Sequence, residues 1–318
     1  MKVSLITPAG KGSRSGNRTT AARWAGILRI LGHRVRVATE YAGEPADLMV
    51  ALHAWRSSSS IERFHELCPQ HPLIVALTGT DIYSFMHTEP STTLRSLDLA
   101  HALVGLHALV GDAIPVRHRG KLEIIYQSAT PLRHLGSRRR RWFDVLVIGH
   151  LREEKDPLRA AEAARLLPEK SRIRVIHFGR AHAPAWAQRA EAEMARNPRY
   201  VWRGEVPYWH VRRAMARAPL MILSSRMEGG ANVISEAVMA GLPVIASDIP
   251  GSVGLLGEAY PGYYPVGDTD ALARLMLLAE QDGDYLGELQ RQCTKRVPLF
   301  RASRERQSWR QLLRNVVR

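Results

Sequence analysis

The sequence has little cysteine, little lysine and no long apolar run. Its two cysteines, Cys68 and Cys293, stand far apart, and no Cys-x-x-Cys or Cys/His pattern has zinc spacing. This argues against a disulfide framework and a structural zinc site, and it favours a reducing, cytoplasmic location. No stretch approaches the roughly 20 apolar residues that span a bilayer, so we expect no stable membrane insertion.

Arginine is abundant by contrast. Lys+Arg number 45 against 30 Asp+Glu, which gives a net charge of +15, and only 6 of the basic residues are lysine. Such a charge attracts anions: nucleic acid, acidic membrane surfaces or phosphorylated small molecules. The arginines are spread through the chain and no familiar nucleic-acid motif accompanies them. We therefore expect no nucleic-acid partner. A basic protein that binds nucleic acid is kept as the alternative outside the enzymes.

The chain consists of two halves with the same pattern. Short, nearly continuous apolar runs alternate with helical patterns, which indicates parallel sheets covered on both faces. A polar stretch at residues 127–142 separates the halves, and we interpret its arginine run, 138–141, as a solvated hinge. The fold class predicted is α/β, with two doubly wound, Rossmann-like domains and an interdomain cleft. Their boundaries are expected at residues 1–137 and 142–299.

The most informative stretch follows the apolar run at residues 220–223 and contains two glutamates, Glu228 and Glu236. Gly229 and Gly230 between them let the backbone approach a ligand closely. A helix that starts near Asn232 would direct free N–H groups at a phosphate. A carboxylate one turn into that helix, at Glu236, can accept two hydrogen bonds from a ribose diol. The pattern predicts a nucleotide-binding loop.

A second cluster, at residues 149–157, follows the first strand of the second half. Arg152 and Lys155 provide two cations at this strand end, which would suit a diphosphate group that gains negative charge as a bond to it breaks. No Asp-x-Asp motif follows a strand, so we predict a metal-independent mechanism without a cofactor.

Loops at strand ends in the first half supply candidate residues for binding a second substrate, called the acceptor below. The loop after the first strand is rich in glycine, serine and cations, which suits an oxyanion. Other polar residues follow the strands predicted at 47–53, 73–78 and 122–125. The acceptor-binding candidates are Gly12, Ser13, Arg14, Asn17, Arg18, His53, Thr78, Thr80, Asp81 and Gln127.

The segment from Glu228 to Glu236 resembles the Glu-x7-Glu motif of retaining nucleotide-sugar glycosyltransferases with the GT-B fold, glycosyltransferase family 4. The resemblance implies that Glu236 holds the nucleotide ribose and that Glu228 contacts the donor sugar. It implies that Lys155 binds the diphosphate, and that the last helix, 300–318, packs back on the N-terminal domain. His150 departs from the pattern, which usually has arginine there. The backbone expected to meet the sugar and diphosphate is that of Gly229, Gly230, Ala231, Asn232 and Val233.

One subgroup is especially similar, the selenosugar synthases of selenoneine biosynthesis. The similarity includes Gly12-Ser13-Arg14, the run at residues 77–81 and the run at residues 249–257. It implies transfer of a sugar, such as N-acetylglucosamine from its UDP donor, onto selenophosphate. A C–Se bond forms, and UDP and phosphate are released. It also implies functional links to a selenophosphate synthase and a selenoneine synthase.

Other enzymes remain open as alternatives. One is a family 4 transferase with a hydroxyl acceptor or with thiophosphate. Another is a UDP-sugar epimerase of similar fold, against which the Glu-x7-Glu pattern argues. Selenium in selenophosphate is already a strong nucleophile, so it needs orientation by cations and N–H groups more than deprotonation.

Overall fold

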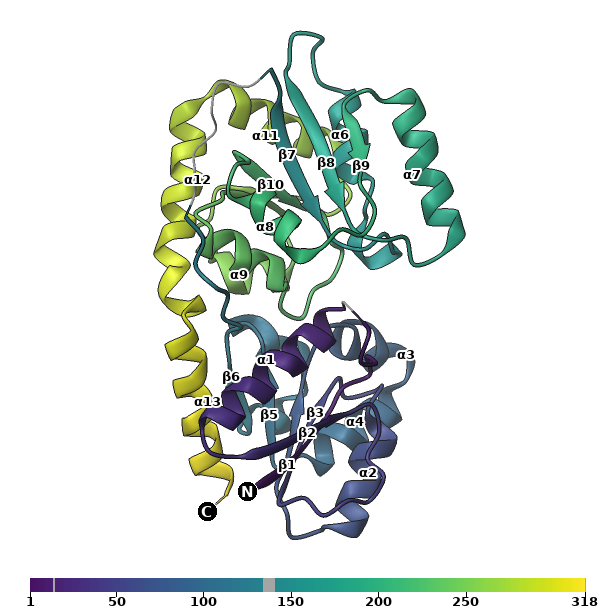
Figure 1. The fold of residues 1–318 in the computed structure, drawn as a ribbon, viewed down its shortest axis with the longest axis vertical. Helices are drawn as coiled ribbons and strands as arrows, with labels where there is room; N and C mark the ends of the chain where they lie inside the picture. The colour runs from purple at the N-terminus through teal and green to yellow at the C-terminus, as the bar shows by residue number, and fades with distance from the viewer. Residues whose placement is uncertain (14, 134–140, 318) are drawn as a thin grey trace. The chain divides into compact units, whose positions relative to one another are not determined.

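The computed structural model describes residues 1–13, 15–133 and 141–317. The chain divides into two units, which are described separately (Figure 1). The first unit comprises Met1–Ser128, Glu228–Asn232 and Arg301–Arg318, and the second comprises Ala129–Met227 and Val233–Phe300. The arginine run at 138–141 lies mostly outside the described residues.

The first unit contains a six-stranded parallel sheet in the order β2-β1-β3-β4-β5-β6. The strand order reverses between β1 and β3. These two strands are parallel neighbours, with Val3 opposite Leu48. The strands are β1 (Lys2–Ile6), β2 (Arg34–Ala38), β3 (Leu48–Leu52), β4 (Leu73–Ala76), β5 (Ala102–Gly105) and β6 (Leu122–Ile124).

Two hydrophobic layers cover the faces of this sheet because alternate strand residues point to opposite sides. Val50 packs in the layer beneath α1 (Gly16–Ile30) and α13 (Ala302–Val316). Its neighbour Ala51 packs in the layer beneath α2 (Ser58–Leu67) and α4 (Pro90–Leu99). The smaller elements are η1 (Asp81–Phe85), α3 (Met86–Thr88), η2 (Ala108–Ala113) and α5 (Val116–Arg119).

The second unit has a parallel sheet of the same kind, in the order β12-β11-β10-β7-β8-β9. Helices cover both faces: α8 and α9 lie on one and α6 and α11 on the other (Figure 1). The strands are β7 (Phe143–Ile148), β8 (Ile173–Phe178), β9 (Tyr200–Trp202), β10 (Leu220–Leu223), β11 (Val244–Ser247) and β12 (Tyr263–Tyr264). The helices are η3 (Glu153–Lys155), α6 (Arg159–Arg165), α7 (Pro184–Arg196), α8 (Tyr208–Met215), α9 (Asn232–Met239), α10 (Pro250–Leu256), α11 (Thr269–Gln281), α12 (Gly283–Arg296) and η4 (Val297–Phe300).

The prediction of two doubly wound, parallel α/β units is thus confirmed. The apolar runs predicted as strands are strands because both faces of each sheet are buried. Across the described part of the chain, no helix combines the length and the apolar character needed to cross a membrane.

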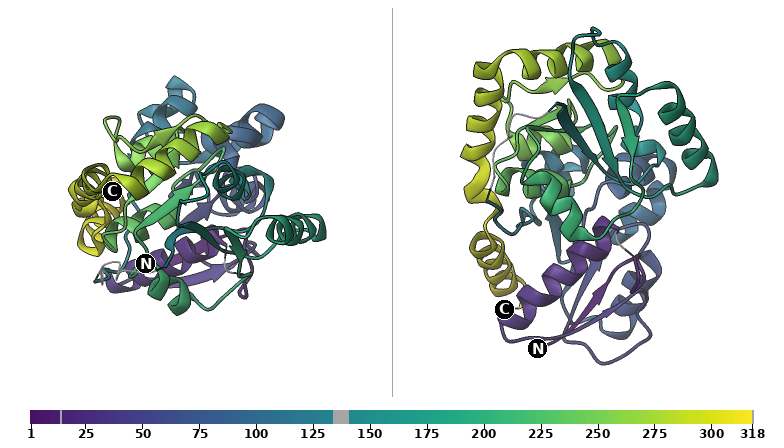
Figure 2. Two further views of the ribbon diagram at one scale, coloured as in Figure 1. Left: turned by 90° about the horizontal axis from the view of Figure 1, so that it is seen from above. Right: turned by 45° about the horizontal axis from the view of Figure 1, so that its top comes forward.

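Helix α13 is fixed to the first unit by a buried carboxylate. The right panel of Figure 2 shows α13 beside α1, and the rings of Trp24 and Trp309 meet edge to face at 4.9 Å. Glu305 on α13 is fully buried. Its Oε1 accepts hydrogen bonds from Trp24 Nε1 at 2.8 Å and from Arg23 Nε at 3.2 Å. Its Oε2 accepts from the Ser128 N–H at 2.9 Å and from the Ser128 hydroxyl.

Replacement of Glu305 should therefore destabilise the first unit strongly. Glu305→Ala leaves the donors of Arg23, Trp24 and Ser128 buried without an acceptor, and we expect a loss of about 3–5 kcal/mol in the free energy of unfolding. Urea denaturation measures it. Glu288→Ala, which removes an ion pair to Arg291 at the surface of α12, should change stability far less, because surface ion pairs contribute little. Equal stability of the two variants would contradict this role.

Candidate functional site

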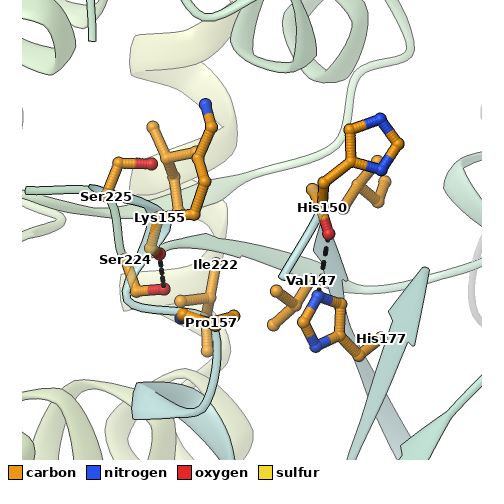
Figure 3. A pocket seen from close by; sticks show the side chains of 11 residues that line it. Val147, His150, Lys155, Pro157, His177, Ile222, Ser224 and Ser225 are labelled. Carbon is orange, nitrogen blue, oxygen red and sulfur yellow. Dashed lines mark hydrogen bonds between the residues drawn. The ribbon is translucent and has the colours of Figure 1, made fainter. Parts of the chain in front are cut away.

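The strand order of the second unit reverses between β7 and β10. These strands are parallel neighbours with Val147 opposite Ile222, so their carboxyl ends lie at the same edge of the sheet. Ligands of doubly wound folds bind in the crevice outside such a switch point. A pocket is present there (Figure 3). The polar and small residues that line it include Gly149, His150, Lys155, His177, Ser224 and Ser225.

The loop after β7 is tied to the loop after β10 by hydrogen bonds to its backbone. The Ser224 hydroxyl lies 3.1 Å from the carbonyl oxygen of Lys155 and 2.9 Å from that of Asp156. The Arg226 N–H donates to the Glu154 carbonyl at 2.8 Å. Because these bonds use only backbone groups of the Lys155 loop, they fix the base of the lysine side chain and leave its ammonium group at the pocket (Figure 3).

A buried histidine supports the other wall of the pocket. His177 Nε2 lies 3.0 Å from the Gly149 carbonyl oxygen and must carry the proton, so Nδ1 accepts from the Tyr200 hydroxyl at 2.9 Å. Burial lowers the pKa of His177 to about 4. The side chain is therefore neutral at pH 7, and it holds Gly149 at the strand end.

His150 and Arg152 occupy the loop that follows Gly149. The His150 ring lies 5.0 Å from the His182 ring, and its Nδ1 accepts from the Arg180 N–H at 3.3 Å. Burial, followed by the nearby His182, lowers the pKa of His150 to about 4. Arg152 forms an ion pair with Glu154 at 3.0 Å, while its Nε is buried with no partner among the described residues.

Helix α9 carries the second glutamate of the Glu-x7-Glu pattern. Glu236 is half-buried one turn into the helix. Its Oε1 accepts a hydrogen bond from the Tyr208 hydroxyl at 3.2 Å, and Tyr208 is the first residue of α8. The chain thus brings a carboxylate and a phenol together from segments 28 residues apart.

The first glutamate and the glycines group with the first unit, as part of Glu228–Asn232. This segment lies very close to the loop after β4: a Cβ added to Gly229 would come within 2.1 Å of the Thr78 carbonyl carbon. No residue other than glycine fits at that distance. Glu228 itself is nearly buried.

Gln127 is buried and contacts the same segment. With its amide oriented to satisfy its neighbours, the amide nitrogen donates to the Gly230 carbonyl at 3.0 Å and to Asn232 Oδ1 at 3.1 Å. The amide oxygen accepts from the Thr20 hydroxyl at 2.6 Å and from Arg23 at 3.1 Å. This geometry makes Gln127 a positioning residue for the glycine segment, although the sequence suggested a direct acceptor contact.

The loop after β4 and the end of β3 are joined by His53 and Thr80. His53 has a φ of 76°, rare for a residue with a side chain, which is typical of functional sites. Its Nδ1 accepts the Arg56 N–H at 3.1 Å, so Nε2 donates to the Thr80 Oγ1 at 2.9 Å. Burial is the main cause that lowers the pKa of His53. The neutral imidazole thus leaves the Thr80 hydroxyl proton available for a ligand.

Asp81 is surrounded by backbone N–H groups of its own loop and of the loop after β3. Its carboxylate is fully buried and accepts hydrogen bonds from four backbone N–H groups, those of Ala54, Thr78, Gly79 and Ile82, at 2.7–3.2 Å. Asp81 therefore shapes the loop, and its contact with an acceptor stays a prediction. The neighbouring Thr78 Oγ1 is buried and has no partner within the described residues.

The loop after β1 leads into α1. The Ser13 N–H donates to the Gly10 carbonyl at 3.0 Å, and the Ser15 hydroxyl caps α1 by accepting from the Arg18 N–H. Gly12 is exposed, and Asn17 and Arg18 are half-buried in the first turn of α1. Arg14 lies outside the described residues.

Several residues at these sites escaped the sequence analysis. Ser224 and His177 act on backbone groups of distant loops, and Tyr208 and Thr20 reach partners far along the chain. Only Ser224 carried a signal, because it ends an apolar strand next to the glutamate motif. In the part of the chain that is described, no three His, Cys, Asp or Glu residues come together in a way that could hold a metal ion.

The two parallel α/β units have the GT-B fold of glycosyltransferases. The family model described as glycosyl transferases group 1 matches residues 139–298, half of the chain. The chain belongs to this family. Comparison with curated protein sequences finds no match.

Solved structures of similar fold cover nearly the whole chain. Alr3699/HepE of Anabaena, in complex with UDP and glucose, has 16% identity and a TM-score of 0.78, over 99% of this chain and 100% of that chain. Sucrose-phosphate synthase of Thermosynechococcus elongatus has 14% identity and a TM-score of 0.79, over 99% of both chains. A glycosyltransferase of Rickettsia africae has 13% identity and a TM-score of 0.73, over 100% of this chain and 98% of that chain.

The neutral state of His177 predicts a pH dependence of stability. The pKa is about 4 in the folded protein and about 6.5 in an unfolded chain. Between these values the unfolded chain binds more protons, so the free energy of unfolding decreases as pH falls from 6.5 to 4, by up to about 1.4 kcal/mol per pH unit. His177→Gln removes this contribution and should flatten the profile measured by urea denaturation from pH 7 to pH 5. Parallel profiles would contradict the assignment.

Proposed function

We propose that this protein is a UDP-sugar glycosyltransferase that transfers N-acetylglucosamine to selenophosphate. The observation that carries the donor half of the proposal is the pocket at the β7–β10 switch point, with Lys155 at its edge and a glycosyl transferase family match over the same residues. The acceptor half rests on the sequence resemblance to selenosugar synthases.

The donor diphosphate would bind at the ends of β7 and β10. Lys155 supplies an ammonium group there, and the guanidinium group of Arg152, on the same loop, would supply a further cation. As the glycosidic bond breaks, negative charge grows on the departing diphosphate, and these cations stabilise the transition state more than the ground state. Because these groups can perform this task, we propose that the reaction needs neither a metal ion nor another cofactor.

The nucleoside and the sugar would be held by the Glu-x7-Glu segment. Glu236 offers carboxylate oxygens to the ribose hydroxyls, while Glu228 and the amides of Gly229 to Val233 would face the sugar and diphosphate. The solved structures of Alr3699/HepE contain UDP, UDP with glucose, or UDP-glucose. Their similarity in fold supports UDP as the nucleotide for this chain.

The acceptor would bind at strand ends of the first unit. Thr80 is oriented by His53 to donate a hydrogen bond, and the loop after β1 brings the exposed Gly12 and the hydroxyl-bearing Ser13. Together with Arg14 and Arg18, these groups suit a small, multiply charged anion. No general base is required, since the selenium already carries the nucleophilic electron pair.

The reaction balances without an external oxidant or reductant. The selenium lone pair forms the C–Se bond as the anomeric C–O bond breaks, and UDP leaves with that electron pair. Water then cleaves the Se–P bond and releases phosphate and the selenosugar. A selenophosphate synthase would supply the acceptor, and a selenoneine synthase would use the product.

An acceptor assay tests the proposal directly. The purified protein is incubated under reducing, anaerobic conditions with UDP-N-acetylglucosamine and, in separate reactions, selenophosphate, thiophosphate or a panel of sugar alcohols. We expect mass spectrometry to detect a selenium-containing sugar and stoichiometric UDP. Product from a hydroxyl acceptor alone would reject selenophosphate but retain the transferase; no UDP release with any acceptor would reject both.

Loss of the lysine ammonium should impair transfer while the fold is retained. Lys155→Met leaves the backbone hydrogen bonds of the loop in place, and we expect kcat/KM for the donor to fall about 10²–10³-fold, as for other groups that stabilise developing charge. Lys170→Met, on an exposed loop of the same unit, is the matched control and should change kcat/KM less than about twofold. A similar small effect for both variants would exclude Lys155 from the diphosphate site.

A further inference from the structure

The segment after β4 carries a second hydroxyl group that is held by a buried histidine. His107 follows β5, which lies beside β4 in the sheet. Its ring is fully buried, and its Nδ1 accepts a hydrogen bond from the Leu109 N–H at 3.2 Å. Its Nε2 lies 3.1 Å from the hydroxyl oxygen of Tyr83, in η1. The arrangement repeats that of His53 and Thr80, in which the histidine follows β3, the strand on the other side of β4.

The hydrogen bonds of this pair determine where the proton of the Tyr83 hydroxyl points. Burial lowers the pKa of His107 to about 4, so the ring is neutral at pH 7 and carries one proton. Because Nδ1 accepts, that proton is on Nε2, and the Tyr83 oxygen accepts it. Burial, followed by the charge of Asp81, raises the pKa of Tyr83, so the phenol keeps its own proton. The hydroxyl of the half-buried Tyr83 therefore directs its proton away from His107.

The turn that carries Tyr83 is fixed by hydrogen bonds to its backbone. η1 is a π-helical turn, a rare form that is frequent at functional sites. The Tyr83 N–H donates to the Gly79 carbonyl at 2.9 Å, and the Gly79 N–H donates to the buried Asp81 carboxylate at 2.7 Å. A donor on a fixed turn loses less conformational freedom when it binds a ligand than a donor on a mobile loop does.

The glycine segment of the Glu-x7-Glu motif packs against the loops of both histidine–hydroxyl pairs. A Cβ added to Gly229 would overlap the carbonyl group of Thr78, at the start of the loop after β4. A Cβ added to Gly230 would overlap the side chain of Leu106, the residue before the second histidine. The glycine segment and these loops belong to the same unit. In the proposed function the segment meets the donor sugar, so the loops that carry the two pairs would border that sugar.

We propose that the Tyr83 hydroxyl, held by His107, donates a hydrogen bond to an oxygen of the anionic acceptor. The inference rests on the proposed function, in which selenophosphate binds at strand ends of the first unit. It adds a ligand-binding residue, Tyr83, and a positioning residue, His107. Phosphate-type oxygens without protons only accept hydrogen bonds, so hydroxyls fixed as donors favour such an anion over an alcohol, which also has a proton to donate.

Steady-state kinetics with each substrate varied in turn tests the assignment. UDP release is measured with selenophosphate varied at saturating UDP-N-acetylglucosamine, and then with the roles exchanged, under reducing, anaerobic conditions. For Tyr83→Phe we expect KM for selenophosphate to rise about 10-fold, because a hydrogen bond to a charged group is lost. KM for UDP-N-acetylglucosamine should change less than twofold, because the variant retains every group proposed to bind the donor.

Further variants separate a ligand contact from a general effect on the first unit. Tyr41→Phe removes a phenol that donates to the Glu44 carbonyl at 2.8 Å in the same unit, and it should leave both KM values unchanged. His107→Leu removes the positioning ring and should also raise KM for selenophosphate. In a Tyr83→Phe background, His107→Leu should raise that KM no further, because the hydroxyl that it positions is absent. The Tyr83→Phe result decides the assignment by itself if His107→Leu does not fold.

Each other outcome overturns the inference. An unchanged KM for selenophosphate in Tyr83→Phe would exclude Tyr83 from the acceptor site while the proposed function stands. A rise in KM for UDP-N-acetylglucosamine instead would assign Tyr83 to the donor, and an equal effect of Tyr41→Phe would make the loss structural. A further rise in the double variant would mean that His107 does not act through Tyr83. If the wild type transfers no sugar to selenophosphate, the proposed function fails as well.

Discussion

The second unit depends on one side-chain interaction at its switch point. Two loops leave the sheet there side by side, and each has backbone groups that no strand can satisfy. For the Lys155 loop, the Ser224 hydroxyl provides the hydrogen-bond donor that the carbonyl oxygens of Lys155 and Asp156 require. Because the hydrogen bonds involve the backbone, they fix the loop without engaging the ammonium group of Lys155. The loop that carries this cation is thus held in place before any ligand arrives.

The histidines around the pocket are neutral, although the chain as a whole is very basic. Burial lowers the pKa of both His150 and His177 to about 4, so neither adds positive charge at pH 7. His177 instead supports Gly149 through a neutral hydrogen bond. In the first unit the buried His53 acts in the same manner on Thr80. The imidazoles orient neighbouring groups, while lysine and arginine provide the permanent charge that an anionic ligand requires.

The sheets could be predicted from the sequence because their strands are nearly continuous apolar runs, but side-chain contacts could not. Strand β12 has two residues and α12 is mostly polar, so neither has a pattern that a sequence analysis detects. The glutamate motif and Lys155 could be proposed as site residues from the sequence because glycines, charges and a strand end coincide there. Asp81 was assigned a ligand contact since its position at a strand end is all that the sequence reveals; its four backbone donors depend on how the loop folds.

The most direct test of this account is the crystal structure of the protein with bound UDP. The account predicts the diphosphate oxygens within hydrogen-bond distance of the Lys155 ammonium group, about 3 Å, and the ribose hydroxyls at the Glu236 carboxylate. UDP bound elsewhere on the chain, with both of these side chains left in solvent, would contradict it.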